Sequence, residues 1–212
     1  MKSNRRLFAF VMTFVLVITL VVTEKDQRVD AASKYISVNA FAEALVNELG
    51  LDIDELSGTS GYVKKLITIG IMNTGEFTSY TAALRRGDLL MLLNRADNYL
   101  YNTNIDAKLI QTVIDKRISD IAKVPESKQD DIARGYIKGF LKGFSNGNYS
   151  PDRNLKLTSK ILKTDALACL KLLKDKSKRA KISPDGQLLR TTSLPNNAYM
   201  FDYILASFPN RY

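Results

Sequence analysis

Two stretches of the chain repeat the same order of features: a helix with one apolar face, a loop marked by glycine, and a second helix with one apolar face. In the two leading helices the apolar residues recur every three or four positions, at Tyr62, Leu66 and Ile69 and at Ile132, Tyr136 and Phe140. This spacing places them on one side of an α-helix, a side that has to be buried. Gly70 and Gly139 follow where each leading helix must end, as glycine does at a helix C-terminus.

The second helix of each copy has an apolar face of matching spacing. Its residues are Leu89, Leu93, Ala96 and Leu100 in the first copy and Leu162, Ala166, Cys169 and Leu173 in the second. The match predicts that the two helices of each copy pack together and that neighbouring copies share a core. Further helices are expected from Val38 to Gly50, with Ser37 as N-cap, and around Leu109 and Val113. The predicted fold is mainly α; a bundle whose helices look alike by chance is the alternative.

The first residues have the pattern of an export signal. Basic residues at positions 2, 5 and 6 precede an unbroken run of apolar residues and threonine over residues 7–22. Val29 and Ala31 suit cleavage after Ala31. The alternative is a signal anchor that stays in the membrane, since the run is only slightly shorter than the roughly 20 residues of a spanning helix. We expect a secreted protein of the cell wall or cell surface, touching the membrane only through this segment if it is uncleaved.

Composition removes several kinds of chemistry. The chain has no histidine and a single cysteine, which excludes Ser-His-Asp and Cys-His centres, His-ligated metals, internal disulfides and Cys-rich clusters. The adjacent carboxylates Asp130 and Asp131 would point about 100° apart on a helix, so they do not form a facing glycosidase pair. Cys169 lies in an apolar run and is expected to be a buried core residue. We therefore predict a non-enzyme that needs no cofactor and no metal.

Positive charge gathers in the second half of the chain. The formal net charge is +9, yet residues 32–104 carry six basic and eight acidic side chains, whereas residues 105–212 carry twenty and eleven. For an exported protein the polyanions within reach are wall polymers or lipid head groups rather than nucleic acid. The basic run over residues 174–181 either follows such a surface or is a solvated linker.

The order of these elements resembles the S-layer homology module. In that family the second helix opens on a motif such as Ile-Thr-Arg-Ala-Glu, after a loop such as Gly-Tyr-Ser-Asp-Gly-Thr-Phe-Pro-Pro. Here residues 84–88 (Leu-Arg-Arg-Gly-Asp) and 161–165 (Ile-Leu-Lys-Thr-Asp) stand in the motif's place, and residues 143–151 stand in the loop's place. Residues 36–40 (Ile-Ser-Val-Asn-Ala) form a stripped third motif, with Val38 where the family has Arg. The likeness covers residues 36–174, and it departs from the family at the motif's Thr and in lacking Trp.

The resemblance implies a non-catalytic module that holds an exported protein on the bacterial surface by binding anionic secondary cell-wall polysaccharide, often bearing pyruvate ketals. Arg86 and Lys163 stand at the motif's Arg position and are the first glycan-binding candidates, because a cation with several donors suits a carboxylate. The other candidates are Asp88 and Asp165 at the motif's acidic position, followed by Arg85, Tyr149, Asn146 and Asn148. For the two acidic residues, the alternative is a helix N-terminal charge that binds no ligand.

Two other functions remain open. The chain could be a structural or protein-interaction module that has lost glycan binding and contacts wall or S-layer proteins. It could also be the N-terminal anchor of a longer wall-associated enzyme.

The predicted organisation has four parts. These are a signal peptide (1–31), a first S-layer-homology-like unit with its preceding helix (32–104), a second such unit (105–175), and a basic linker with an irregular C-terminal tail (176–212). In the tail, residues 184–186 and 195–197 are turn signals, and the aromatic and apolar residues between Tyr199 and Phe208 suggest a short packed segment.

Overall fold

The computed structural model describes residues 34–53, 58–145 and 150–189. The chain divides into two units, residues 1–35 and 36–212, and the fold that follows is that of the second. The predicted export signal lies outside the described residues. Within the described ranges, no helix is both long enough and apolar enough to cross a membrane.

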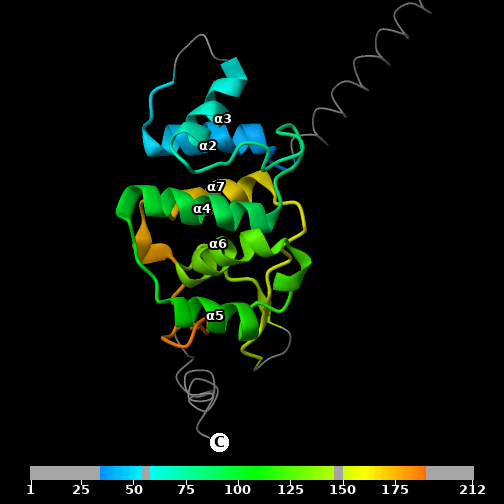
Figure 1. Ribbon diagram of the computed structural model, residues 1–212, viewed down its shortest axis with the longest axis vertical. Helices are drawn as coiled ribbons and strands as arrows, with labels where there is room; N and C mark the ends of the chain where they lie inside the picture. Colours follow the sequence, from blue (N-terminus) through cyan, green and yellow to red (C-terminus); the bar gives the residue numbers. More distant parts are fainter. Residues whose placement is uncertain (1–33, 54–57, 146–149, 190–212) are drawn as a thin grey trace, which may run out of the picture. The chain divides into compact units, whose positions relative to one another are not determined.

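Six α-helices make up most of the regular structure of the described residues, which confirms the mainly α prediction (Figure 1). They are α2 (Val38–Leu49), α3 (Gly58–Thr68), α4 (Arg86–Tyr101), α5 (Ala107–Lys116), α6 (Glu126–Ile137) and α7 (Lys163–Lys171). Two short 3-10 helices, η2 (Ile121–Lys123) and η3 (Lys176–Lys178), follow α5 and α7. The strands β1 (Phe144–Ser145) and β2 (Arg153–Asn154) pair antiparallel between α6 and α7.

The helix ends follow the local signals in the sequence. The Ser37 hydroxyl accepts a hydrogen bond from the Ala40 N–H at 3.2 Å and caps α2. Gly50 and Gly139 take positive φ angles of 67° and 78° after α2 and α6. At Gly139 a Cβ atom would also lie 2.1 Å from the carbonyl oxygen of Ala180, so this glycine both ends a helix and admits a neighbouring segment.

Helix pairing differs from the prediction that the two helices of each copy pack together. The extensive helix contacts are α2 with α3, α4 with α6, α5 with α6, and α2 with α7. The two leading helices are α3 and α6. Each packs against the earlier helix that begins at a motif segment, called a motif helix below: α3 against α2, and α6 against α4. Gly135 allows the α4–α6 contact, since a Cβ atom there would lie 2.7 Å from the carbonyl oxygen of Leu90. Both copies contribute to one hydrophobic core, as predicted.

A ring of three backbone hydrogen bonds joins the segments that precede α2, α4 and α7. The Ile36 N–H donates to the Ile161 carbonyl at 3.4 Å, Ile161 donates to Leu84 at 3.0 Å, and Leu84 donates to Ile36 at 2.8 Å. All three side chains are buried, with at most 2% of their surface exposed. Each is the first residue of a motif segment (residues 36–40, 84–88 and 161–165), so the three motif segments meet at one point.

Two further hydrogen bonds repeat on either side of the ring with the same offsets. The N–H groups of residues 38 and 39 donate to the carbonyls of residues 82 and 80, which lie two and four positions before Leu84. Those of residues 86 and 87 donate to the carbonyls of residues 159 and 157, which lie two and four positions before Ile161. Two of the three motif segments therefore dock in the same way on the loop before the next one, and together with the ring of three this gives an approximate threefold pattern.

Part of the positive charge of the second half is buried. Asp97 on α4 is fully buried, with Lys138 Nζ 3.0 Å from Oδ2 and Arg179 Nη2 2.7 Å from Oδ1. Burial lowers the pKa of the Lys138 ammonium, and contact with Asp97 opposes this lowering. Arg179 belongs to the basic run 174–181, and it also donates to the carbonyls of Leu172 and Leu173. The run is therefore not one continuous exposed surface.

Asp97→Ala should destabilise the fold by about 3–5 kcal/mol, because it leaves two buried cations without a counter-charge. Unfolding in urea, followed by circular dichroism, measures this loss. Asp130→Asn is the matched control, because its ion pair with Arg134 is on the surface and should be worth about 0.5 kcal/mol or less. Equal losses in the two variants would contradict a structural role for the buried cluster.

Cys169 was expected to be a buried core residue; it packs against the core but is only partly buried. Burial raises the pKa of its thiol to about 11. The thiolate is the reactive form, so Cys169 should react slowly as a nucleophile in the folded protein at neutral pH.

Alkylation of Cys169 at pH 8 should be about 100-fold slower in the folded protein than in urea, because the raised pKa leaves little thiolate. Mass spectrometry of samples quenched over time measures both rates. Because the pKa of the Cys169 thiol is raised to about 11 in the folded protein, the rate at which the folded protein is alkylated should increase with pH up to about pH 11. Similar rates at pH 8 in both states would show that the thiol is not protected.

Candidate anion-binding site

The motif segment before α4 lies against the chain that follows β2. Arg85 and Lys160 form an antiparallel bridge, next to the hydrogen bonds that dock residues 86 and 87. The chain after β2 is in turn held by Asp120. This residue is 3% exposed and accepts hydrogen bonds from the N–H groups of Leu155 and Leu157 at 2.8 and 2.7 Å. A buried carboxylate thus fixes the backbone of one wall of the site.

Two cations lie beside one exposed aromatic ring at this junction. Arg86 is half-buried, and its Nε donates to the Leu155 carbonyl at 2.7 Å. Its guanidinium carbon is 5.7 Å from the centre of the Phe144 ring, and Lys156 Nζ is 4.2 Å from the same centre. Phe144 itself is 49% exposed. Lys156 adopts a left-handed backbone with φ of 52°, and its N–H donates to Asn154 Oδ1.

Neither cation is neutralised by a carboxylate of the described residues. This contrasts with Arg95, Arg117 and Arg179, each of which has an acidic partner within 3 Å. A partly desolvated guanidinium without a counter-ion attracts an anion, and a second cation close by strengthens the attraction. The site can therefore bind a carboxylate or phosphate group, with the exposed ring as an apolar contact.

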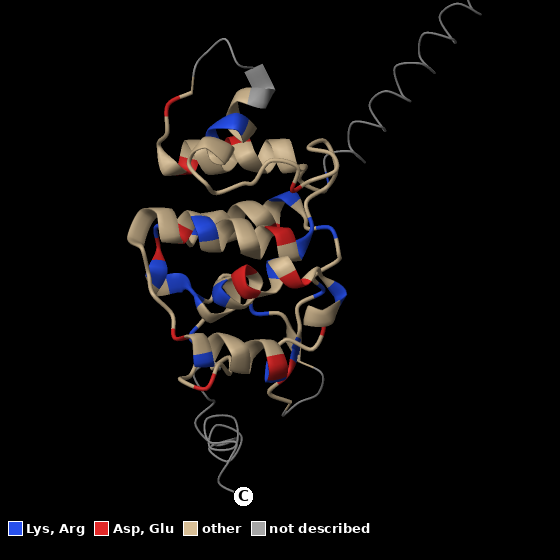
Figure 2. Ribbon diagram, viewed as in Figure 1, with Lys and Arg blue, Asp and Glu red and all other residues tan. Residues whose placement is uncertain are grey.

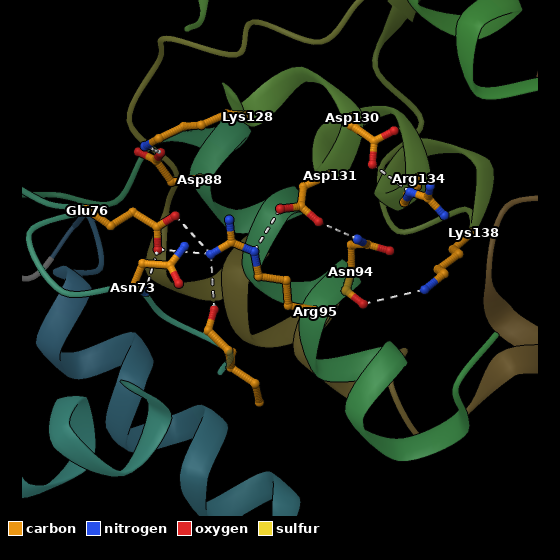
Figure 3. A network of polar contacts seen from close by, with 11 residues as sticks. Asn73, Glu76, Asp88, Asn94, Arg95, Lys128, Asp130, Asp131, Arg134 and Lys138 are labelled. Atoms are coloured by element: carbon orange, nitrogen blue, oxygen red, sulfur yellow. Dashed lines mark hydrogen bonds and ion pairs between the residues drawn. The ribbon is translucent and has the colours of Figure 1, made fainter. Parts of the chain in front are cut away.

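Several acidic residues of α4, α6 and the loop after α3 are engaged in a separate network of polar contacts (Figure 3). Asp88 pairs with Lys128 Nζ at 2.7 Å. Arg95 donates to Asp131 at 2.7 Å and to Glu76 at 2.8 Å. Burial lowers the pKa of Arg95, but Asp131 and Glu76 raise it by more. Both helices carry basic as well as acidic residues (Figure 2), and none of these ion pairs includes Arg86 or Lys156.

The structure brings only some of the predicted site residues together. Arg86 forms the site, and the exposed Arg85 is next to it. Asp88 is held by Lys128. Lys163 and Asp165 are exposed at the start of α7, and no described interaction joins either of them to Arg86. The other three candidates, Asn146, Asn148 and Tyr149, lie outside the described residues.

Sequence reasoning missed Phe144 and Lys156. Phe144 lies in the loop that we compared with the family, where an apolar residue between glycine and serine could have been read as an exposed contact. Lys156 carries no local signal, because its position depends on the left-handed turn after β2.

Comparisons of the chain with protein-family models, curated proteins and solved structures found no match.

Asp120→Ala should destabilise the protein by about 2–4 kcal/mol, because two buried N–H groups lose their acceptor. Asp120→Asn keeps one acceptor oxygen and should cost less. Denaturant unfolding of both variants measures the difference. If neither variant loses stability, the carboxylate does not hold this wall of the site.

Proposed function

We propose that this chain is a non-catalytic module that attaches an exported protein to the cell wall by binding an anionic secondary wall polysaccharide. The observation that carries the proposal is the pair of uncompensated cations, Arg86 and Lys156, beside the exposed ring of Phe144. A sugar that bears a carboxylate offers groups for both features. Its anionic substituent pairs with the cations, and its apolar ring face contacts the aromatic side chain.

We also propose that the repeats are of the S-layer homology type. The three motif segments are joined in one hydrogen-bonded ring, and two of them dock on the following loop with equal offsets. Residues 36–40, the stripped motif, occupy a place in the ring equivalent to the other two. This arrangement supports three related segments where side-chain identity alone supports two.

The three motif segments contribute unequally to binding. Val38 is buried with 2% exposure, so the first segment offers no cation at the motif's third position. Arg86 in the second segment has the aromatic ring and Lys156 beside it. Lys163 in the third segment is exposed and forms no ion pair with a described residue. We therefore expect one main site, centred on Arg86.

Binding to isolated sacculi tests the proposal. The purified protein should co-sediment with sacculi that retain their secondary polysaccharide and not with sacculi stripped of it. Lys156→Ala and Phe144→Ala should each weaken binding about tenfold, since each removes one contact worth about 1.4 kcal/mol or more. Both side chains are exposed, so the variants should fold normally.

Lys108→Ala is the matched control, because Lys108 is an exposed lysine on α5, outside the site. It should bind as the unaltered protein does. Equal binding to stripped sacculi would contradict recognition of the polysaccharide. Capture of a wall or S-layer protein without polysaccharide binding would instead support a protein-interaction module.

A further inference from the structure

The outward face of α7 is an apolar hollow. A cavity of about 350 Å³ opens there, lined by Thr164, Leu167, Ala168, Lys171, Leu172, Asp175 and Lys178. The helical members of this set recur at intervals of three and four, so they form one face of the helix. Leu167 and Leu172 are only partly buried and Ala168 is exposed. No described segment of the chain covers this face.

The packing of the other two motif helices, α2 and α4, indicates which kind of segment should cover this face of α7. The helix that follows α2 packs along α2, and a helix that follows α4, namely α6, packs along α4. After α7, the described chain contains only η3 and an extended segment up to Leu189. α7 is therefore the one motif helix of the described residues without a following helix packed along it.

The extended segment after η3 packs beside the C-terminal ends of α5 and α6. The Ala180 N–H donates to the Gly139 carbonyl at 3.0 Å, and Arg117 Nη2 pairs with Asp185 Oδ2 at 2.5 Å. The segment then turns back, since the Leu189 N–H donates to the Lys181 carbonyl at 2.8 Å. Lys181 is three residues beyond Lys178, which lines the cavity. At about 3.5 Å per residue, Leu189 therefore lies within about 15 Å of the backbone of Lys178, at the rim of the cavity.

The remaining sequence has a segment of suitable composition and length. Residues 198–208 contain seven large apolar or aromatic side chains: Tyr199, Met200, Phe201, Tyr203, Ile204, Leu205 and Phe208. Asn197 and Pro209 bound the segment, as capping and terminating residues do. It is eleven residues long, the same as α3. Its single acidic residue, Asp202, complements the exposed Lys171 at the rim of the hollow.

We propose that residues 198–208 of the same chain pack on the outward face of α7, in the position that α3 holds on α2 and α6 holds on α4. The proposal does not depend on glycan binding. It assigns a role to the aromatic tail, which the proposed function leaves unused. An exposed apolar face and an aromatic segment then cover each other, and neither is left in water.

Disulfide trapping tests the contact in the purified protein. In a Cys169→Ala background, Leu167→Cys is combined in turn with Met200→Cys, Phe201→Cys, Tyr203→Cys and Ile204→Cys, and the protein is oxidised. We expect a rapid disulfide within the monomer for one or two of these pairs, since the Cβ atoms must come within about 4.5 Å. Lys108→Cys on α5, combined with the same tail residues, should form none. Disulfides only between chains would identify a second copy as the occupant and overturn the proposal, as would the absence of any disulfide.

Hydrogen exchange gives a second, independent measurement. In the unaltered protein the amides of residues 198–208 should be protected, and Leu167→Asp should remove this protection while α4 stays protected. Retained protection in α4 distinguishes loss of the contact from unfolding of the protein. Equal exchange of residues 198–208 in both proteins would overturn the proposal.

Discussion

The hydrogen-bonded ring of Ile36, Leu84 and Ile161 determines where the rest of the fold can lie. Its residues are buried, and a buried backbone group without a partner costs about as much as a lost hydrogen bond. Each segment finds its partner in the next one, so the ring has to close. Because the bonds are made by the backbone, they do not depend on the side chains that follow. This explains how serine, arginine and leucine can all stand at the second position of the motif segments.

The ring also explains why the candidate site is shared between copies. It fixes the motif segment of the first copy against the loop of the second, so the side chain at the third position faces that loop. At this position Arg86 reaches the Leu155 carbonyl, whereas Val38 joins the core. A single copy would supply either the guanidinium or the aromatic ring, but not both. Binding by this site therefore requires the packed arrangement of both copies.

The sequence predicted the positions of the helices because their signals are local. Ser37 and Gly50 act within one turn of a helix end, and periodicity shows which face is buried. The spacing of apolar residues does not show which other helix packs against that face, which is why the predicted helix pairs were wrong. The pairing of α4 with α6 depends on Gly135, whose missing Cβ matters only beside Leu90. Arg179 was grouped with an exposed run because its partner, Asp97, is 82 residues away in the chain.

The same reasoning separates charge that maintains the fold from charge that can bind a ligand. In the densest basic run, Arg179 is neutralised by Asp97, Lys178 pairs with Asp175, and Lys174 lies 3.4 Å from Glu48. The number of lysine and arginine residues in this run therefore overestimates how strongly the surface attracts a polyanion. Arg86 and Lys156 are 70 residues apart in the sequence, yet both lie beside Phe144, and no carboxylate of the described residues pairs with either. Attraction for an anion follows the absence of a counter-charge and not the local density of lysine and arginine.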